Sequence, residues 1–440
     1  MITPPATLGM LGGGQLGRFF VMAAHELGYR VLVLDPDEHS PAGRCADEHI
    51  VAAYDDLAAL ERLAGQCAAI TTEFENVPAD TLANLSKFVT VRPNAEAVRT
   101  CQNRSAEKAF LKRHGFPHAP YADIRSEADL REANAGLFPG ILKVARFGYD
   151  GKGQARVNSR AEALIAWSQL RNEPCVLEQQ LKLDYEVSVV LARDEHGAVR
   201  CFPTAENSHR HGILDISLVP ARTSGCLAAN EPRKNNLDRC PLADEMPGKA
   251  QNAPCGWPHK RFATRHGARM QDGQCSSCSF SVTKLPNEAE EIAEGIAQKM
   301  DYVGTLGVEF FIVHGQLYVN EMAPRPHNSG HYTLDACVTS QFEQQVRALC
   351  GLPLGEARAH SAAAMVNLLG DIWYRADPHH AHEPDWAQLL AIPNLKLHLY
   401  GKRHPRPGRK MGHFTVIGTD PAEVQKSALA GRRLMGISDE

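Results

Sequence analysis

The stretch Val319-Asn-Glu-Met-Ala-Pro-Arg-Pro-His-Asn-Ser-Gly-His331 puts an amide and a carboxylate at the end of an apolar strand, followed by a guanidinium and two imidazoles. A second carboxylate, Glu309, lies inside the apolar run Leu306-Gly-Val-Glu-Phe-Phe-Ile-Val313 just upstream. A charge buried alone in such a run is costly, so this carboxylate is expected to have a partner. Oxygen ligands of this kind suit a Mg²⁺ ion that carries nucleotide phosphates, and the cationic residues that follow would face an anionic substrate.

The register of the hairpin between these two stretches is a testable prediction. A three-residue loop at 314–316 would pair Glu309 with Glu321 on one face of the sheet. A two-residue loop would pair Glu309 with Asn320 and turn Glu321 away, because a slip of one residue flips every side chain. The metal-site interpretation requires the first register. Its alternative is a surface hairpin whose carboxylates are solvated.

Length and composition limit the class of protein. The chain has 440 residues, enough for about two to four domains, and a net charge of −4 that favours neither a nucleic-acid nor a membrane surface. No apolar run approaches the ~18 residues of a membrane span, and the first residues lack the pattern of a signal peptide. We therefore expect a cytoplasmic protein whose twelve cysteines are reduced.

Residues 1–100 alternate strand and helix patterns and predict an open, doubly wound α/β domain. Gly12-x-Gly14-x-x-Gly17 after the first strand matches the dinucleotide fingerprint, and Asp35 stands where an acid could bind a ribose. Glycines at such a turn also let other ligands approach the backbone, and no nicotinamide chemistry follows downstream. A nicotinamide-dependent oxidoreductase is thus one alternative function.

A nucleotide-binding pattern follows in residues 101–180. The strand 140–144 carries Lys143, and the glycine-rich loop 147–154 adds backbone N–H groups and Lys152 that could face phosphate. The alternative is a plain hairpin turn. The strand 175–179 ends in a carboxylate and an amide, which are candidate partners for an adenine edge and a ribose.

Residues 361–440 predict a smaller αβ unit with one basic segment, 402–413. Five basic side chains within nine residues, at a turn fixed by proline, suggest a phosphate clamp. The alternative is a solvated basic loop.

Five blocks of this chain resemble ATP-grasp enzymes and, more closely, the family of N5-carboxyaminoimidazole ribonucleotide synthetases. In family order, they are residues 12–18, 72–78, 147–154, 320–331 and 406–413. The resemblance implies a Rossmann-like domain at 1–100 that binds no NAD, an ATP-grasp region at 101–360, and a small C-terminal domain at 361–440. The ATP-grasp region would divide into subdomains at 101–180 and 181–360, and the protein would form a homodimer.

The resemblance also implies roles for individual residues. ATP would contact Arg104, Lys143, Gly148, Tyr149, Asp150, Gly151, Lys152, Gly153, Gln154, Glu178, Gln179, Glu186, His209, Asn320 and Glu321. The aminoimidazole ribonucleotide would contact Gln15, Leu16, Glu73, Asn76, Lys402, Arg409 and Lys410. Mg²⁺ would be held by Glu309 and Glu321, and bicarbonate by Arg325, His327 and Asn328. The catalytic residues would be Tyr149, Asp150 and Lys402.

The implied reaction transfers the γ-phosphoryl group of ATP to bicarbonate, and the resulting carboxyphosphate, or CO₂ released from it, carboxylates the amine of the ribonucleotide. Asp150 is the candidate for taking the amine proton, with Tyr149 orienting it. The loop 147–154 would close as a lid that excludes water. A formate-dependent ATP-grasp ligase of purine synthesis and a non-catalytic nucleotide-binding protein are further alternatives.

Residues 224–284 depart from the family pattern, and a helix over 287–300 is expected to resume it. The composition favours a disordered surface insertion. A small zinc module is the second interpretation, with Cys275-x-x-Cys278 as half a ligand set and Cys255, His259 and His266 as possible partners. The third is a sequence artefact such as a locally shifted reading frame.

Overall fold

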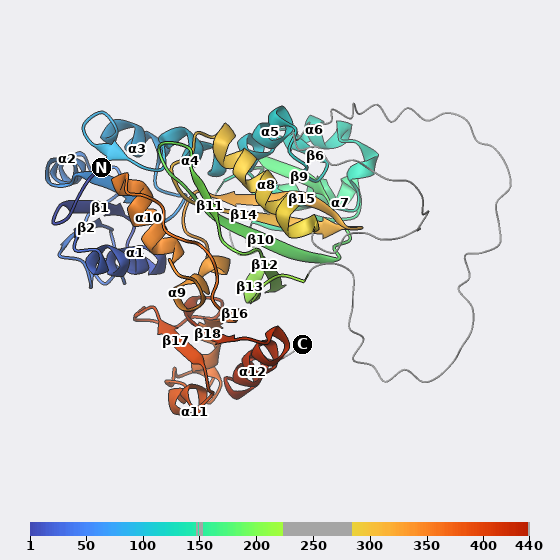
Figure 1. The fold of residues 1–440 in the computed structure, drawn as a ribbon. Helices are drawn as coiled ribbons and strands as arrows, with labels where there is room; N and C mark the ends of the chain where they lie inside the picture. Colours follow the sequence, from blue (N-terminus) through green and yellow to red (C-terminus); the bar gives the residue numbers. More distant parts are fainter. Residues whose placement is uncertain (147, 149–152, 223–283, 439–440) are drawn as a thin grey trace, which may run out of the picture. The chain divides into compact units, whose positions relative to one another are not determined.

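The computed structural model describes residues 1–146, 148, 153–222 and 284–438, and these are shown in Figure 1. Five residues of the predicted loop 147–154 lie outside the described residues, namely Phe147, Tyr149, Asp150, Gly151 and Lys152. The three interpretations of the segment 224–284, including its zinc module, also fall outside them except at residue 284. None of the helices in the described ranges is long and apolar enough to cross a membrane.

The N-terminal part is a parallel sheet with helices on both faces, as the sequence predicted. The strand order is β3-β2-β1-β4-β5. The strands are β1 (Thr7–Leu11), β2 (Arg30–Leu34), β3 (Glu48–Ile50), β4 (Ala69–Thr72) and β5 (Thr90–Val91). The helices are α1 (Gln15–Glu26), α2 (Leu57–Gln66), α3 (Ala79–Leu85) and α4 (Ala95–Cys101). The central strands are mostly apolar because helices cover both faces: α1 packs on one face and α2 and α3 on the other.

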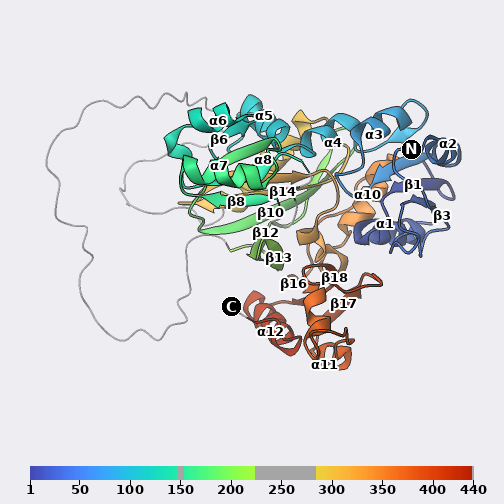
Figure 2. The ribbon, with the colours of Figure 1, turned by 180° about the vertical axis from the view of Figure 1, so that it is seen from behind.

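A small antiparallel sheet follows, in the order β6-β9-β7-β8. Its strands are β6 (Tyr121–Ile124), β7 (Gly140–Val144), β8 (Gln154–Val157) and β9 (Cys175–Gln179). The helical elements of this region are α5 (Arg104–His114), α6 (Glu127–Glu132), α7 (Arg160–Gln169) and the short 3₁₀ helix η1 (Ala135–Leu137). Figure 2 shows α6 and α7 beside this sheet, and their apolar residues form its core. The strands predicted at 140–144 and 175–179 have the observed bounds.

A large antiparallel sheet contains the rest of the strands, in the order β15-β14-β10-β12-β13-β16-β18-β17, with β11 paired to β10. The strands are β10 (Tyr185–Arg193), β11 (Val199–Cys201), β12 (Ala205–Arg210), β13 (Ile213–Val219), β14 (Gly304–Val313), β15 (Gln316–Ala323), β16 (Ala362–Leu369), β17 (Leu395–Leu399) and β18 (Lys410–Gly418). The helices are α8 (Lys284–Lys299), η2 (Asn328–Gly330), α9 (Thr333–Ala336), α10 (Gln341–Cys350), η3 (Gly370–Tyr374), α11 (Trp386–Leu390) and α12 (Pro421–Leu434). The sheet runs across the boundary proposed at 360/361, because β16 is hydrogen-bonded to β13.

The β14–β15 hairpin has the predicted pairing but not the predicted loop. Val313 pairs with Gln316, so the loop has two residues, and both adopt positive φ angles of 50° and 71°, which this kind of tight turn requires. The three-residue loop was therefore wrong. Glu309 nevertheless pairs with Glu321, because a β-bulge at Asn320 shifts the register by one residue. The bulge breaks the alternation, so Asn320 and Glu321 are both partly exposed between two buried residues of the strand.

Candidate active site

A cavity of about 680 Å³ brings together side chains from the N-terminal, central and C-terminal parts of the chain. It is lined by Gln15, Leu16, Glu73, Phe74, Glu75, Asn76, His209, Gly212, Ile213, Leu214, Glu309, Glu321, Arg325, His327, Asn328, Lys402, Arg406, Pro407, Gly408, Arg409 and Lys410. All the residues predicted to contact the ribonucleotide, bicarbonate and the metal are among them. Of the described residues predicted to contact ATP, His209 and Glu321 line the cavity.

The remaining described residues predicted for ATP are not part of the lining of this cavity. They are Arg104, Lys143, Gly148, Gly153, Gln154, Glu178, Gln179, Glu186 and Asn320. Side-chain contacts connect this set to the lining, and one of them joins Asn320 Nδ2 to Glu309 Oε2. Arg104 Nη1 lies 3.2 Å from Glu321 Oε2, and Glu186 Oε2 lies 2.9 Å from His209 Nδ1. Burial alone would lower the pKa of His209, but the hydrogen bond with Glu186 raises it overall.

Glu309 is the best-connected carboxylate of the cavity. His327 Nε2 lies 3.2 Å from its Oε1, and Asn320 Nδ2 donates to its Oε2 at 3.3 Å. Burial opposes the charged form, but the hydrogen bond and charge of His327 lower the pKa of Glu309 to about 2. Asn320 Oδ1 is buried and has no hydrogen-bond partner among the described residues. An unsatisfied amide oxygen beside two carboxylates is the donor set that a hard cation prefers, so these residues fit Mg²⁺.

Glu178 is the buried counter-ion of two lysines. It is 2% exposed, and its carboxylate lies 3.2 Å from Lys143 Nζ and 3.6 Å from Lys108 Nζ. Burial opposes its charge, but Lys143 and Lys108 lower the pKa of Glu178 to about 2. Its predicted contact with ATP stays a prediction. Lys108 was not predicted.

Each of the residues predicted to hold bicarbonate is hydrogen-bonded to a neighbouring side chain. Arg325 Nε donates to Glu75 Oε2 at 2.6 Å, a partner that the sequence analysis missed. His327 Nδ1 lies 2.8 Å from the hydroxyl of Ser329, which leaves Nε2 directed to Glu309. The Asn328 side chain is fixed by a reciprocal amide pair with Asn367, at 3.1 and 2.8 Å. A guanidinium and an imidazole are thus held side by side at one wall of the cavity.

The basic loop from the C-terminal part is held in place by hydrogen bonds that involve its backbone groups. Lys402 Nζ donates to the carbonyl oxygen of Lys410 at 2.7 Å, and Arg409 Nη1 donates to that of His404 at 2.9 Å. The N–H of Gly408 donates to Asp371 Oδ2 at 2.7 Å, where the φ of 74° favours glycine. The loop therefore presents cationic side chains to the cavity from a fixed turn, which supports a phosphate clamp over a solvated loop.

At the glycine-rich turn after β1, carboxylates of the protein accept the hydrogen bonds of the backbone N–H groups. Glu73 accepts hydrogen bonds from the N–H groups of Gly14 at 2.5 Å and Gly17 at 2.6 Å, at the N-terminus of α1. Asp35 accepts from the N–H of Gly13 and the hydroxyl of Tyr54, both at 2.6 Å. A dinucleotide would use these same backbone groups for its pyrophosphate and this acid for its ribose. The geometry therefore gives the oxidoreductase alternative no support.

Sequence reasoning missed three kinds of residue. Glu75 lies within the block 72–78, two residues after Glu73, but nothing local shows that it faces Arg325. Glu107 and Lys108 stand at positions that share the buried stripe of α5 with Phe110 and Leu111, and charges within such a stripe were the available signal. Asn367 lies on β16 in an apolar run, where a lone amide also indicates a specific partner.

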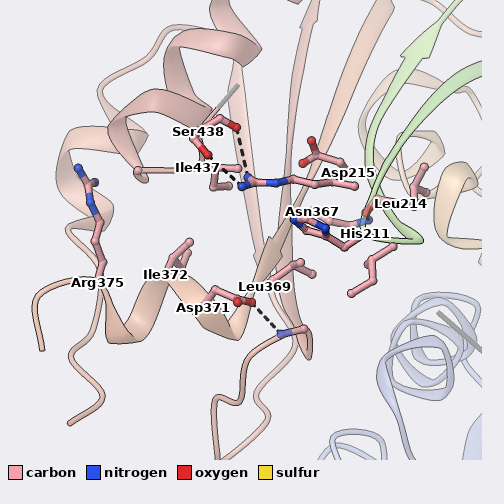
Figure 3. A pocket seen from close by; sticks show the side chains of 14 residues that line it. His211, Leu214, Asp215, Asn367, Leu369, Asp371, Ile372, Arg375, Ile437 and Ser438 are labelled. Carbon is pink, nitrogen blue, oxygen red and sulfur yellow. Dashed lines mark hydrogen bonds between the residues drawn. The ribbon is translucent and has the colours of Figure 1, made fainter. Parts of the chain in front are cut away.

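A second cavity, of about 410 Å³, adjoins the first at Ile213, Leu214 and Gly408. Figure 3 shows Asp215, Asp371 and Ser438 around it, and each is hydrogen-bonded to protein atoms. Asp215 accepts from Arg432 at 2.6 Å, and the hydroxyl of Ser438 accepts from Arg210 at 2.9 Å. Since these polar groups have protein partners, we assign no ligand to this cavity.

Comparison with known proteins gives three family matches in chain order. A ribonucleotide synthetase preATP-grasp domain matches residues 5–102, and an ATP-grasp domain matches residues 109–233 and 262–342. A phosphoribosylaminoimidazole carboxylase C-terminal domain matches residues 363–427. The break at 234–261 falls inside the segment that departs from the family pattern.

Two relatives that match nearly the whole chain have the same name. The N5-carboxyaminoimidazole ribonucleotide synthase of Brucella melitensis is 38% identical over 94% of this chain and 97% of its own, and that of Bacillus subtilis is 36% identical over 95% and 93%. A solved ADP complex of such a synthetase has a TM-score of 0.81, 34% identity, and coverage of 100% of this chain and 99% of its own. A structure from Aspergillus clavatus, in complex with ADP and 5-aminoimidazole ribonucleotide, has a TM-score of 0.77 at 26% identity, covering 98% of each chain.

The fold and the cavity define the class of protein as an ATP-grasp ligase with a pre-ATP-grasp domain before it and a small domain after it, as the sequence predicted. Within that class, the chain belongs to the family of N5-carboxyaminoimidazole ribonucleotide synthases.

Proposed function

We propose that this chain uses ATP and bicarbonate to carboxylate 5-aminoimidazole ribonucleotide to N5-carboxyaminoimidazole ribonucleotide in purine synthesis. One observation carries the proposal. A single cavity contains a carboxylate pair suited to a nucleotide-bound metal, an arginine and histidine suited to a small anion, and a basic loop suited to a substrate phosphate. Membership of the family agrees with this reaction and favours bicarbonate over formate.

The nucleotide side of the proposal rests on the carboxylates of the hairpin. Glu309, Glu321 and the amide oxygen of Asn320 would hold Mg²⁺, with the phosphates of ATP supplying further oxygen ligands. The bound ion would neutralise charge on the transferred phosphoryl group. Arg104 contacts Glu321 of this set and would add positive charge at the phosphates. Lys143, which Glu178 holds in position, would add a second positive charge there.

The bicarbonate side rests on Arg325, His327 and Asn328. In the proposed first step, a bicarbonate oxygen attacks the γ-phosphorus of ATP, the bond to the β-phosphate oxygen breaks, and ADP leaves. Little covalent chemistry is required of the protein, because positioning and charge stabilisation lower the barrier for such transfers. Arg325 also contacts Glu75 at 2.6 Å, so the bound anion would share the guanidinium with that carboxylate.

The ribonucleotide side rests on Gln15, Leu16, Glu73, Asn76, Lys402, Arg409 and Lys410. In the second step, the amine nitrogen attacks the carboxyl carbon of carboxyphosphate or of the CO₂ that it releases. Phosphate departs, and the amine gives up a proton. We keep Asp150 as the proposed acceptor of that proton, with Tyr149 beside it and Lys402 as the third catalytic residue.

Release of ADP in the presence of bicarbonate tests the function directly. The rate is expected to rise strongly when 5-aminoimidazole ribonucleotide is added, and N5-carboxyaminoimidazole ribonucleotide should accumulate with ADP in equal amounts. Stimulation only by formate with a glycinamide ribonucleotide would overturn the proposal and support the alternative ligase.

The cellular location and the oligomeric state are two further proposals. The reaction needs ATP and small phosphorylated substrates, which agrees with a cytoplasmic enzyme that has no nucleic-acid or membrane partner. A homodimer is proposed from the family resemblance alone. Sedimentation equilibrium at micromolar concentration tests it, and a mass equal to one chain would overturn it.

A further inference from the structure

Glu107 and Lys108 are adjacent charged residues on α5, and both are buried, with 1% and 0% exposure. A buried charge is tolerated only where hydrogen-bonding or ionic partners compensate for its lost hydration. Both side chains reach the backbone of β15. Lys108 Nζ donates to the carbonyl oxygens of Asn320 at 2.9 Å and Val319 at 3.5 Å. Glu107 Oε1 accepts from the N–H of Met322 at 2.6 Å.

These backbone groups lie at the edge of the large sheet. β15 is the edge strand, with an isolated bridge between His118 and Val319 as its contact on the outer side. Edge strands leave backbone groups without strand partners, and such groups are costly if they are buried and unbonded. The side chains of Glu107 and Lys108 therefore supply hydrogen bonds that a further strand would otherwise provide.

The contacts bracket the β-bulge that orients the proposed metal ligands. Asn320 and Met322 are the residues immediately before and after Glu321, and the register shifts at this point. Without the shift, a hairpin with this two-residue loop would pair Glu309 with Asn320 and turn Glu321 to the other face. Holding the backbone on both sides of Glu321 keeps its side chain on the face of Glu309.

Lys108 also connects the small sheet to the large sheet. Its Nζ lies 3.6 Å from Oε2 of Glu178, which is on β9 of the small sheet, and 2.9 Å from the backbone of Asn320 on the large sheet. The other oxygen of Glu178 lies 3.2 Å from Lys143 Nζ. A single buried ammonium group thus contacts both the counter-ion of Lys143 and the strand that carries Glu321.

We propose that Glu107 and Lys108 are positioning residues of the nucleotide–metal site, which fix the bulge of β15 and connect it to the Glu178–Lys143 pair. The inference rests on the proposed function, because that function assigns Glu309 and Glu321 to metal-bound ATP. Neither residue lines the cavity, so they act on the nucleotide through the groups that they hold. Groups that orient metal ligands affect metal affinity about 10- to 100-fold when they are removed.

Lys108→Met tests the proposal by removing the ammonium group while keeping a long apolar side chain. Titration calorimetry with ATP in the presence of Mg²⁺ is expected to show binding weakened at least about tenfold, and KM for MgATP should rise with it. KM for 5-aminoimidazole ribonucleotide should stay within about twofold, since its proposed ligands lie elsewhere. Arg92→Met is the matched control, because Arg92 also donates to two backbone carbonyls, of Ala348 and Leu349, and lies outside the cavity lining.

Glu107→Leu and Glu107→Gln separate positioning from folding. Glutamine keeps an oxygen that can accept from the N–H of Met322, so it should retain MgATP affinity within about threefold. Leucine removes the acceptor and should weaken MgATP binding about tenfold or more. If Lys108→Met does not fold, the two Glu107 variants still test the positioning role.

The two proposals fail in different ways. If the wild-type protein binds MgATP but releases no ADP with bicarbonate and ribonucleotide, the proposed function fails, whereas the calorimetric comparison among variants still stands. If the wild-type enzyme is active and both Lys108→Met and Glu107→Leu bind MgATP as tightly as it does, the positioning role is wrong. An equal loss of MgATP affinity in Arg92→Met would also overturn it, because the effect would then be general destabilisation.

Discussion

Two regions of this molecule resemble ligand-binding sites in sequence, one for an anion and one for a metal ion, and they differ in where their hydrogen bonds go. At the glycine-rich turn, the carboxylates of Glu73 and Asp35 satisfy the free N–H groups at the start of α1. At the β14–β15 hairpin, Asn320 Oδ1 is buried and has no partner in the part of the chain that the structure describes, beside the two carboxylates of Glu309 and Glu321. A motif whose polar groups are satisfied internally supports the fold, whereas a cluster that keeps unsatisfied oxygens is prepared for a ligand.

The comparison predicts that a carboxylate at the hairpin acts on catalysis. Glu309→Gln removes one charge from the proposed metal site, and ADP release should fall about 1,000-fold, because preorganised charge is the main source of rate enhancement in phosphoryl transfer. Steady-state ADP release with saturating bicarbonate and ribonucleotide measures this. Glu343→Gln, on α10 and paired only with Arg347, is the control and should retain nearly full activity. If Glu309→Gln turned over at the wild-type rate, the hairpin would not be a ligand-binding region distinct from the glycine-rich turn.

Glu73 at the glycine-rich turn lines the cavity as a proposed ribonucleotide contact, and its hydrogen bonds should make it act on stability as well. Glu73→Ala removes the acceptor of the partly buried N–H of Gly14 and of the buried N–H of Gly17, and each hydrogen bond to a charged group is worth about 1.5–3 kcal/mol. The free energy of unfolding should fall by about 3 kcal/mol, as measured by urea denaturation. The exposed Glu127→Ala, which breaks a surface pair with Arg131, should cost less than about 1 kcal/mol. A Glu73→Ala protein that keeps wild-type stability and gains NADH binding would show that the turn is a dinucleotide site after all.

Two buried histidines, His331 and His413, make the stability of the protein depend on pH. Burial, together with neighbouring positive charges, holds the pKa values of His331 and His413 well below the ordinary value for histidine. As pH falls below about 6.5, the unfolded chain binds protons that the folded chain does not, so stability is fully present above that pH and is lost as the pH falls. Each such histidine contributes up to about 1.4 kcal/mol per pH unit.

His413→Phe tests this pH dependence. The variant loses the hydrogen bond with the Tyr400 hydroxyl, at 3.0 Å, so its stability at pH 8 should be lower. Its loss of stability between pH 6 and 5 should nevertheless be smaller than that of the wild type, by about 1 kcal/mol per pH unit. Urea midpoints across this range measure the slope, and the exposed His196→Gln should leave it unchanged. An unaltered slope in His413→Phe would mean that this imidazole takes up its proton in the folded protein.

Local pattern was enough to predict several of the strands and helices, because the alternation of apolar residues and the positions of turn-forming glycines depend on neighbours in sequence. The strand at 175–179 and the helix from about 105 to 114 follow from such patterns, with α5 starting one residue earlier. The bulge at Asn320 could not be predicted, because a two-residue turn and an extra strand residue compensate each other in the final pairing. The contact between Glu75 and Arg325 joins positions 250 residues apart, and only the folded chain reveals it.

The smallest expected effect concerns that last contact. Burial would raise the pKa of Glu75, but the Arg325 guanidinium lowers it overall, so Glu75 is charged and competes with bicarbonate for the same guanidinium. Glu75→Gln keeps an oxygen that can accept from Arg325 Nε and therefore keeps its orientation, while the competing charge is removed. KM for bicarbonate should fall about threefold, which corresponds to less than about 1 kcal/mol. Initial rates at varied bicarbonate and saturating ATP measure the change. A rise in KM instead would mean that the charge of Glu75 is needed to hold Arg325, and would place this carboxylate with the satisfied, structural groups of the glycine-rich turn.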